Sequence, residues 1–193
     1  MARDVVMVNG LPGSGKSSLA PPLAARLGAA CLGKDRIKEA LADAVVTEVP
    51  RLGAVAMATV WHLAAALSGM VVVDSWWFRP RDLADARAGL ACSGARATVE
   101  IWCDVPAELA RARYVARRRH TVHGDAEKLA TEWAGWAAAA EPLGLGPVIR
   151  VDTAAPVDLR ALADEVRSAL WAPEPAAPAN RSALEKPPET RLS

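Results

Sequence analysis

The stretch Gly10-Leu11-Pro12-Gly13-Ser14-Gly15-Lys16-Ser17 decides the fold. It follows the apolar run Val5-Val6-Met7-Val8 and precedes a helical pattern that begins near Lys16. This spacing, between a strand and a helix, is typical of a phosphate-binding loop. Backbone N–H groups can wrap a phosphate chain only where side chains are small or absent, as the three glycines allow. The following helix directs the positive end of its dipole at the same phosphates.

Two side chains of the loop predict further chemistry. Lys16 supplies a mobile cation for the β- and γ-phosphates, and the Ser17 hydroxyl is the expected Mg²⁺ ligand. Asp74 ends the apolar run 70–74, where a carboxylate would hold Mg²⁺ directly or through water, because the carboxyl ends of parallel strands face the ligand crevice. The alternative that Asp74 only caps the loop that follows it stays open.

The composition is that of a globular, near-neutral protein. The chain has 193 residues, is 52% hydrophobic and 23% charged, and carries a formal net charge of +1. A dedicated nucleic-acid binder would be more basic. The three cysteines, Cys31, Cys92 and Cys103, lack metal-ligand spacing and are interpreted as core residues of a reducing compartment. Without a long apolar run or leader pattern, we expect a cytoplasmic protein with no membrane contact.

Apolar runs alternate with helical patterns along the chain, which predicts a three-layer α/β domain with a parallel sheet. The pair Pro21-Pro22 should tighten or kink the first helix. Residues 1–171 form the expected domain, and 172–193 form a proline-rich tail expected to be disordered. The expected strands are 4–9, 29–32, 70–74, 97–103 and 147–151, and the expected helices are 17–27, one from 36, 51–67, 81–90, 106–119, 127–140 and 156–171.

Asp35 is the candidate catalytic base. It follows the second strand and should lie at the same sheet edge as the phosphates, where a carboxylate can orient a nucleophilic hydroxyl and take its proton. Capping of the helix that begins at Arg36 is a compatible alternative. An arginine cluster precedes a flexible break at 120–125, so at least one of Arg113, Arg117 and Arg119 should close on the transferred phosphate. An ordinary solvated helix face is the alternative. The cluster consists of Arg111, Arg113, Arg117, Arg118 and Arg119.

Trp76 and Trp77 follow Asp74 at the ligand edge. They are expected either to wall an acceptor pocket or to pack in the core, and the sequence does not separate the two. Acceptor specificity is assigned to the helices near Asp35 to Leu67 and to the loop from Trp76 to Arg81, which includes Arg79.

These motifs resemble the small P-loop kinases of the polynucleotide-kinase, chloramphenicol-phosphotransferase and zeta-toxin group, often labelled AAA family ATPases. The matching segments are the loop continued to Ser18, then Lys34-Asp35-Arg36-Ile37-Lys38, then Val71-Val72-Val73-Asp74, the segment 113–119, and the closing strand that ends at Thr153. The resemblance implies a P-loop NTPase fold with a five-stranded parallel sheet and a short arginine-bearing lid.

The resemblance also implies ATP as donor, a hydroxyl as acceptor and Asp35 as base. It implies a lid that carries Arg113 or Arg117, and an adenine site near Arg113 and Thr153. Two departures matter. Polynucleotide kinases carry an arginine that holds the substrate phosphate where this chain has Lys38, which offers only a point charge. They carry small polar residues where Trp76-Trp77-Phe78 stands here.

The sequence therefore predicts an ATP- and Mg²⁺-dependent phosphotransferase that acts on a hydroxyl of a small molecule such as a sugar, nucleoside or antibiotic. Lys38, Trp76, Trp77 and Arg79 are the expected acceptor contacts beside Asp35. Two alternatives stay open: a 5′-hydroxyl polynucleotide kinase, and a nucleotide-binding switch or accessory ATPase with no hydroxyl acceptor.

Overall fold

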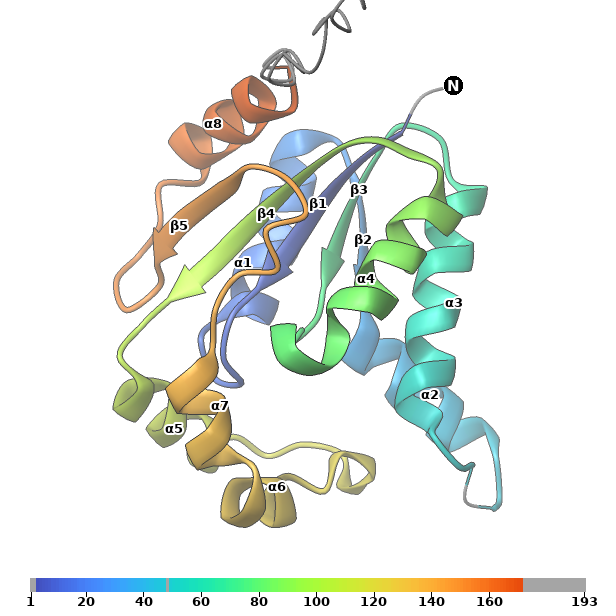
Figure 1. Ribbon diagram of the computed structural model, residues 1–193, viewed down its shortest axis with the longest axis vertical. Coiled ribbons are helices and arrows are strands. Elements are labelled where there is room, and N and C mark those ends of the chain that lie inside the picture. The colour runs from blue at the N-terminus through green and yellow to red at the C-terminus, as the bar shows by residue number, and fades with distance from the viewer. Residues whose placement is uncertain (1–2, 48, 172–193) are drawn as a thin grey trace, which may run out of the picture.

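A computed structural model describes residues 3–47 and 49–171 of the protein. Its centre is a parallel sheet of five strands in the order β2-β3-β1-β4-β5 (Figure 1). The strands are β1 (Arg3–Asn9), β2 (Ala30–Gly33), β3 (Met70–Asp74), β4 (Ala95–Asp104) and β5 (Val148–Asp152). The helices are α1 (Lys16–Leu27), α2 (Lys34–Ala44), α3 (Leu52–Ala66), α4 (Arg79–Ser93), α5 (Ala107–Ala116), η1 (Thr121–His123), α6 (Asp125–Thr131), α7 (Trp133–Ala139) and α8 (Leu159–Trp171).

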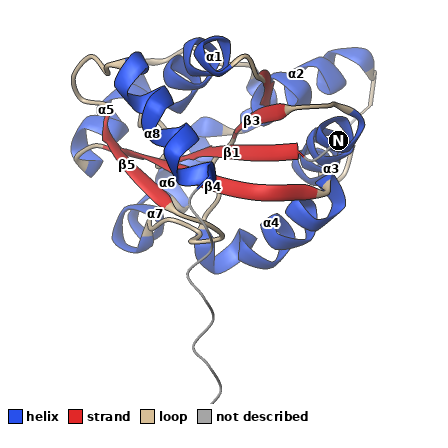
Figure 2. Ribbon diagram, turned by 90° about the horizontal axis from the view of Figure 1, so that it is seen from above, coloured by secondary structure: helices blue, strands red, loops and turns tan. Residues whose placement is uncertain are grey.

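Strand β1 lies in the middle of the sheet, and its apolar run is buried on both faces. Val6 and Val8 pack towards α1 and α8 on one face, whereas Val5 and Met7 pack towards α3 and α4 on the other. Figure 2 shows these helices on opposite sides of the sheet. A strand covered on both faces needs apolar residues at consecutive positions. The predicted three-layer P-loop fold with a five-stranded parallel sheet is thus confirmed.

Helices α5, α6 and α7 lie together beyond the carboxyl ends of the strands (Figure 1). They enclose a third apolar cluster that contains Leu11, Tyr114, Trp133 and Trp136. This cluster joins the loop after β1 to the helices that follow β4. It therefore supports the sheet edge at which the predicted site residues lie.

Several predicted helices differ from the structure in their bounds. Helix α5 ends at Ala116, so residues 117–119 leave the helix, and the predicted helix 127–140 is two helices. Pro21 and Pro22 lie inside a continuous α1. Both prolines are exposed, so the carbonyl groups that lose their helical partners face solvent, where water can satisfy them. The helix therefore continues through both prolines.

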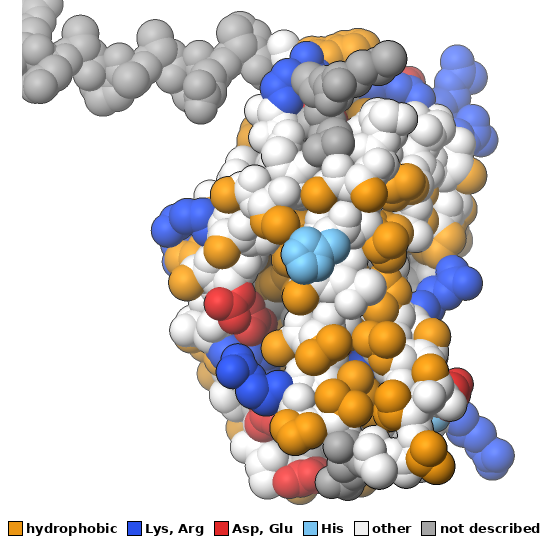
Figure 3. All heavy atoms as spheres, turned by 90° about the vertical axis from the view of Figure 1, so that its right-hand side faces the viewer, with side chains coloured by type: hydrophobic (Ala, Val, Ile, Leu, Met, Phe, Trp, Pro, Cys, Tyr) orange, Lys and Arg blue, Asp and Glu red, His pale blue; other side chains and the backbone are white. Residues whose placement is uncertain are grey.

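The buried face of α3 also differs from its apolar pattern. Ala56, Val60 and Ala64 are buried, whereas Val55 and Leu63 are 43% and 42% exposed. Figure 3 shows hydrophobic side chains gathered on the side of the molecule that carries α3. Helical spacing alone could not separate the two apolar faces, because nearly every position in this helix is apolar.

The cysteines are all free within the described residues, and Cys103 lies in the core, as expected. Cys92 is exposed, which corrects its assignment to the core. No helix in the described part of the chain is long and apolar enough to cross a membrane. The predicted tail, 172–193, lies outside the described residues.

Candidate active site

The loop between β1 and α1 has the conformation that its glycines permit. Gly10, Gly13 and Gly15 have φ angles of 142°, 86° and 93°, in the region that disfavours side chains. A Cβ at Gly13 would lie 2.1 Å from the carbonyl oxygen of Ala110, and one at Gly10 would lie 2.6 Å from that of Cys103. Backbone conformation therefore favours glycine at all three positions, and close packing against neighbouring backbone requires it at Gly10 and Gly13.

The side chain of Lys16 crosses the loop and is buried. Its Nζ donates to the carbonyl oxygens of Gly10 and Leu11, at 2.8 Å each. Burial lowers the pKa of this ammonium, and the carboxylates of Asp74 and Asp35 partly offset the effect. A phosphate chain on the loop would supply stronger, charged acceptors to the same ammonium.

The sheet register brings Asp74 and Asp35 to the same edge. Asp74 pairs with Val8 of β1 and with Gly33 of β2, and Asp35 follows Gly33 by two residues in the first turn of α2. Burial raises the pKa of Asp74, partly offset by Lys16 and by a hydrogen bond from Ser17. The predicted metal pair, Ser17 and Asp74, is thus in contact in the folded chain.

The donor set around Ser17 fits Mg²⁺ held mainly through a nucleotide. No group of three or more carboxylate, histidine or cysteine ligands occurs in residues 3–47 and 49–171. One hydroxyl and one carboxylate, hydrogen-bonded to each other, leave most coordination positions to phosphates and water, which is how Mg²⁺ binds in nucleotide enzymes. Whether these two residues hold the ion stays a prediction.

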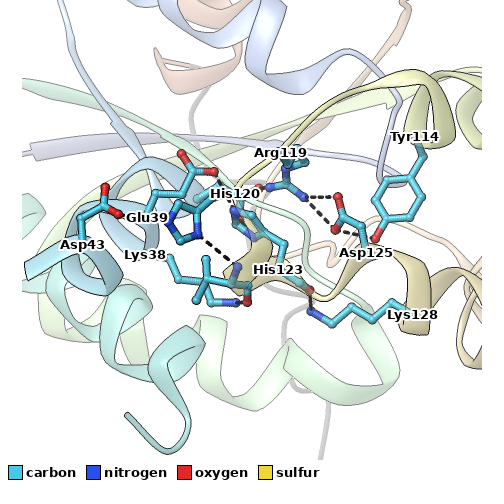
Figure 4. Close-up of polar contacts among 11 residues, drawn as sticks. Lys38, Glu39, Asp43, Tyr114, Arg119, His120, His123, Asp125 and Lys128 are labelled. Atoms are coloured by element: carbon cyan, nitrogen blue, oxygen red, sulfur yellow. Dashed lines mark hydrogen bonds and ion pairs between the residues drawn. The ribbon is translucent and has the colours of Figure 1, made fainter. Parts of the chain in front are cut away.

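Residues 117–131, which we call the lid, are fastened to α2 by polar contacts (Figure 4). Arg119 bridges Asp35 of α2 and Asp125 of α6, at 3.3 Å from the latter. His123 lies 2.7 Å from Glu39 and 3.9 Å from Asp35. The lid therefore lies over the candidate base in this structure.

Two further ties hold the lid to α2. Lys38 donates to the carbonyl oxygen of Val122 at 2.7 Å, and His120 lies 3.0 Å from Asp43. Lys38 thus contacts the lid backbone in this structure.

The ionisation of Asp35 reflects these neighbours. Burial favours the neutral acid, but the electrostatic effect of Arg119, His123 and Lys34 outweighs it and holds the pKa of Asp35 below its usual value. Burial lowers the pKa of His123, partly offset by its bond to Glu39. In this arrangement Asp35 is an ionised carboxylate, the form that accepts a proton.

Two cavities open on either side of Lys16. The loop cavity, of about 490 Å³, lies over the start of α1 and the segment after β5. The lid cavity, of about 330 Å³, lies between α2, α3, the lid and the tryptophan loop, residues 75–78. The two share Lys16, Ser17 and Arg117. Ligands in both cavities would therefore meet at the phosphate-binding loop.

The loop cavity gathers the predicted nucleotide residues other than Gly10, Pro12 and Ser14. It is lined by Gly13, Gly15, Lys16, Ser17, Ser18, Arg113 and Thr153. Arg113 donates to the carbonyl oxygens of Thr153 and Ala154, at 3.1 and 3.4 Å. Arg113 thus lies beside the loop cavity, and Arg117 lies where this cavity meets the lid cavity. The Arg117 guanidinium is 4.7 Å from the ring centre of Tyr114.

Trp76 and Trp77 line the lid cavity and also pack against other aromatic rings. Trp77 is stacked on Trp61 at 6.3 Å, and Trp76 lies 6.1 Å from Trp136. The two tryptophans therefore both wall the lid cavity and pack among other aromatic side chains, so each of the two alternatives is partly correct. Arg79 lines neither cavity and instead binds Glu141 at 2.9 Å, so the structure does not bring this residue to the site.

Asn9 connects the two sides of the site. Its side-chain oxygen accepts from the N–H groups of Gly10, at 2.8 Å, and Trp77, at 3.0 Å. Its side-chain nitrogen donates to the buried carboxylate of Glu100 at 2.9 Å. The phosphate-binding loop and the tryptophan loop are thus fixed to one side chain.

Comparison with known proteins agrees with this geometry. The family model described as an AAA domain, of the AAA_33 type, matches residues 5–143. The chain belongs to this AAA domain family. No functionally curated protein matches the sequence. The resemblance to P-loop kinases that the motifs indicated is therefore confirmed at the level of family and fold.

Solved structures share the fold of this AAA domain. A candidate kinase from Chloroflexus aurantiacus is 24% identical, with 88% of this chain and 100% of that one covered and a TM-score of 0.72. The APS kinase of Mycobacterium tuberculosis, in complex with AMPPNP and APS, is 21% identical over 89% and 99%, with a TM-score of 0.58. A gluconokinase from Sinorhizobium meliloti is 20% identical over 86% and 89%, with a TM-score of 0.51.

Sequence reasoning missed several residues that line the lid cavity of this AAA domain. They come from α2, the tryptophan loop and the lid, and they include Lys34, Ser75, Tyr114, Asp125 and Lys128. The few lysines of the sequence could have pointed to this cavity. The chain has five lysines, and the four within the described residues, Lys16, Lys34, Lys38 and Lys128, all line this cavity.

Proposed function

We propose that the protein is an ATP- and Mg²⁺-dependent kinase that phosphorylates a hydroxyl group of a small molecule. The observation that carries this proposal is the pair of cavities that meet at Lys16 and Ser17, with the phosphate-binding loop on one side and Asp35 on the other. A volume of about 330 Å³ for the lid cavity is at the small end of ligand sites, which supports a small acceptor. Structural neighbours named as kinases of small molecules support the same assignment.

In the proposed reaction, the loop N–H groups and Lys16 bind the β- and γ-phosphates. Lys16 exchanges its bonds to Gly10 and Leu11 for bonds to phosphate oxygens. Asp35 accepts the proton of the acceptor hydroxyl while that oxygen bonds to the γ-phosphorus and the bond to the ADP oxygen breaks. Arg117, at the junction of the cavities, neutralises charge on the transferred group. Mg²⁺, held at Ser17 and Asp74, would supply charge neutralisation on the β- and γ-oxygens.

For Asp35 to act, its pairing with Arg119 must loosen. The two groups are in direct contact in this structure, so an acceptor hydroxyl that approaches Asp35 competes with the guanidinium. The lid that carries Arg119 is therefore expected to shift when the acceptor binds. In the shifted position Arg119 is a second cation available to the transferred phosphate.

The test measures ATP consumption by three proteins: wild type, Asp35→Asn and the control Glu165→Gln. Each is offered a panel of acceptors, namely sugars, nucleosides, hydroxylated antibiotics, hydroxy acids, phosphate monoesters and a 5′-hydroxyl oligonucleotide. Glu165 is an exposed carboxylate on α8 that lines neither cavity. We expect one class of small acceptor to stimulate turnover, and Asp35→Asn to reduce kcat by about 10²–10⁴-fold, as loss of a general base does. The affinity for ATP should stay within about twofold, because Asp35 lies on the acceptor side.

Two outcomes would replace the proposal with an alternative. Stimulation by the oligonucleotide alone, with a steep loss at high salt, would identify a polynucleotide kinase. ATP hydrolysis that is indifferent to every acceptor and to Asp35→Asn would identify a nucleotide switch or accessory ATPase.

A further inference from the structure

Several donors in the lid cavity have no acceptor. The side-chain ammonium of Lys34, at the first position of α2, makes no hydrogen bond or salt bridge within residues 3–47 and 49–171, although the side chain lines the cavity. The Ser75 hydroxyl and the Trp77 indole N–H are also without hydrogen-bond partners, and these two residues are only 5% and 3% exposed. Buried donors normally find partners, and the unpaired Lys34 ammonium lines the cavity, so a ligand bound there can supply its acceptor.

The carboxylates of the cavity do not neutralise Lys34. Asp35 pairs with Arg119, Asp125 accepts from Tyr114 and Arg119, and Asp82 accepts from Arg81 and the N–H of Phe78. The remaining carboxylate that lines the cavity, Asp85, is exposed to solvent. Lys38 and Lys128 donate to lid carbonyl groups, and in the described part of the chain neither has a carboxylate partner. The side chains that line the cavity thus carry more positive than negative charge.

The start of α3 adds to the same positive potential. Gly53 and Ala54, in its first turn, line the cavity, and a Cβ at Gly53 would lie 4.0 Å from the Lys34 ammonium. The helix has 15 residues, and its N-terminus carries the positive end of the dipole. Burial lowers the pKa of Lys34, partly offset by Asp35 and Asp82. A cation beside the positive end of a helix is unfavourable until an anion joins them.

We propose that the phosphoryl acceptor is an anionic, hydroxylated small molecule whose carboxylate or phosphate group binds between Lys34 and the first turn of α3. The neighbouring residue, Asp35, meets its hydroxyl group. This inference rests on the proposed kinase function and adds the class of acceptor.

The experiment measures equilibrium binding with the loop cavity filled by Mg·AMPPNP, so that added anions cannot occupy the γ-phosphate position. Tryptophan fluorescence reports binding, because Trp76 and Trp77 line the lid cavity. Gluconate and glycerate are compared with glucose and glycerol in the carboxylate arm. Glucose 6-phosphate and glycerol 3-phosphate are compared with the same neutral partners in the phosphate arm.

The variants are Lys34→Met and Lys34→Gln, with Arg87→Gln as a matched control, because Arg87 is exposed and lines neither cavity. We expect at least one anion to bind 10-fold or more tightly than its neutral partner, and the Lys34 variants to weaken it by about 10–100-fold, as loss of a charged hydrogen bond does. The Tm of the ligand-free variants should be equal to or above that of wild type, since no structural partner of Lys34 is lost.

The proposal is overturned if no anion of either arm binds better than its neutral partner, or if the Lys34 variants bind the preferred anion as wild type does. Failure of the kinase proposal itself would give different results: AMPPNP would not bind, or ATP turnover would be independent of every acceptor.

Discussion

At the scale of single residues, the site is held by contacts that substrates must replace. Lys16 is bonded to two loop carbonyl groups, and Arg119 is bonded to the candidate base. Each contact satisfies a buried or partly buried charge, so these side chains are positioned before any ligand arrives. Binding then exchanges one set of charged contacts for another, which costs less than ordering free side chains.

Lys16→Ala tests the donor side. The ammonium is the cation of the phosphate-binding loop, so its removal should weaken ATP binding by about 10–100-fold. Isothermal titration with AMPPNP in the presence of Mg²⁺ measures the change, with Arg87→Gln as the control. Unchanged nucleotide affinity in Lys16→Ala would contradict the assignment of the loop cavity to ATP.

The ion pair of Asp35 predicts a pH effect. Because the folded-state pKa of Asp35 lies below its unfolded value, the pair stabilises the fold above pH ~4 and loses this contribution as the pH falls through the folded pKa. In Arg119→Gln the pKa of Asp35 should rise, and stability should fall less steeply below pH 4. Carboxyl NMR titration and urea unfolding measure the two effects.

Arg118→Gln serves as the neighbouring control, since Arg118 is exposed and makes no ion pair in the described chain. A pKa of Asp35 that is equal in wild type and Arg119→Gln would contradict the pairing.

Gly13→Ala tests the loop backbone. The new Cβ would meet the Ala110 carbonyl oxygen at 2.1 Å, in a conformation with φ of 86°, so we expect a loss of about 2–4 kcal/mol of unfolding free energy, together with loss of ATP binding. Gly135→Ala is the matched control, because a Cβ there meets nothing within 4 Å and alanine favours the α7 helix. Chemical denaturation of both variants gives the comparison.

At the scale of elements, the packing of α3 against α4 depends on one glycine. Gly89 of α4 faces the indole of Trp61 in α3, and a Cβ at this position would lie 2.1 Å from the indole Nε1. Gly89→Ala should therefore cost about 1–3 kcal/mol through overpacking, although alanine is the better helix former. Urea unfolding measures this cost, and a variant as stable as wild type would show that the two helices can separate freely.

The elements also show where sequence patterns suffice and where they fail. The apolar strands and the glycine loop were predictable, because a strand buried on both faces and a phosphate-wrapping turn each restrict residue types strongly. The bounds of α5 and the division of residues 127–140 were not, since the arginines after Ala116 and the alanine-rich run 127–140 are both compatible with helix. Tertiary contacts, such as Arg119 with Asp35, determine where the lid leaves the helix.

At the scale of the whole molecule, the site is formed by residues that are far apart in sequence but share one sheet edge. Asp35 and Asp74 could be placed there from strand order alone, because parallel strands align their carboxyl ends. Lys34 and Ser75 could not be recognised from their spacing. Their significance lies in unpartnered donors, which only the packed structure reveals. Arg79, in contrast, follows the tryptophan loop in sequence but is turned away to Glu141.

Ligand linkage gives a prediction for the folded chain as a whole. Mg·AMPPNP at 100 times its Kd should stabilise the native state by about 2.7 kcal/mol, which corresponds to a rise in Tm of roughly 5–10 °C for a chain of this size. Asp74→Asn, or EDTA with the wild type, should reduce the rise because metal-assisted phosphate binding is lost. Differential scanning fluorimetry gives the comparison, and equal shifts with and without EDTA would contradict the role of Asp74.

The position of Asn9 has a consequence for how acceptor preference can diversify. Because one amide anchors both the nucleotide loop and the backbone of Trp77, substitutions that displace the tryptophan loop would also disturb the ATP site. The start of α3 carries no such tie to the nucleotide loop among the described contacts. Substitutions that change the preferred substrate, whether in evolution or in laboratory selection, should therefore accumulate around Gly53 and Met57 of that helix, while residues 75–78 change little.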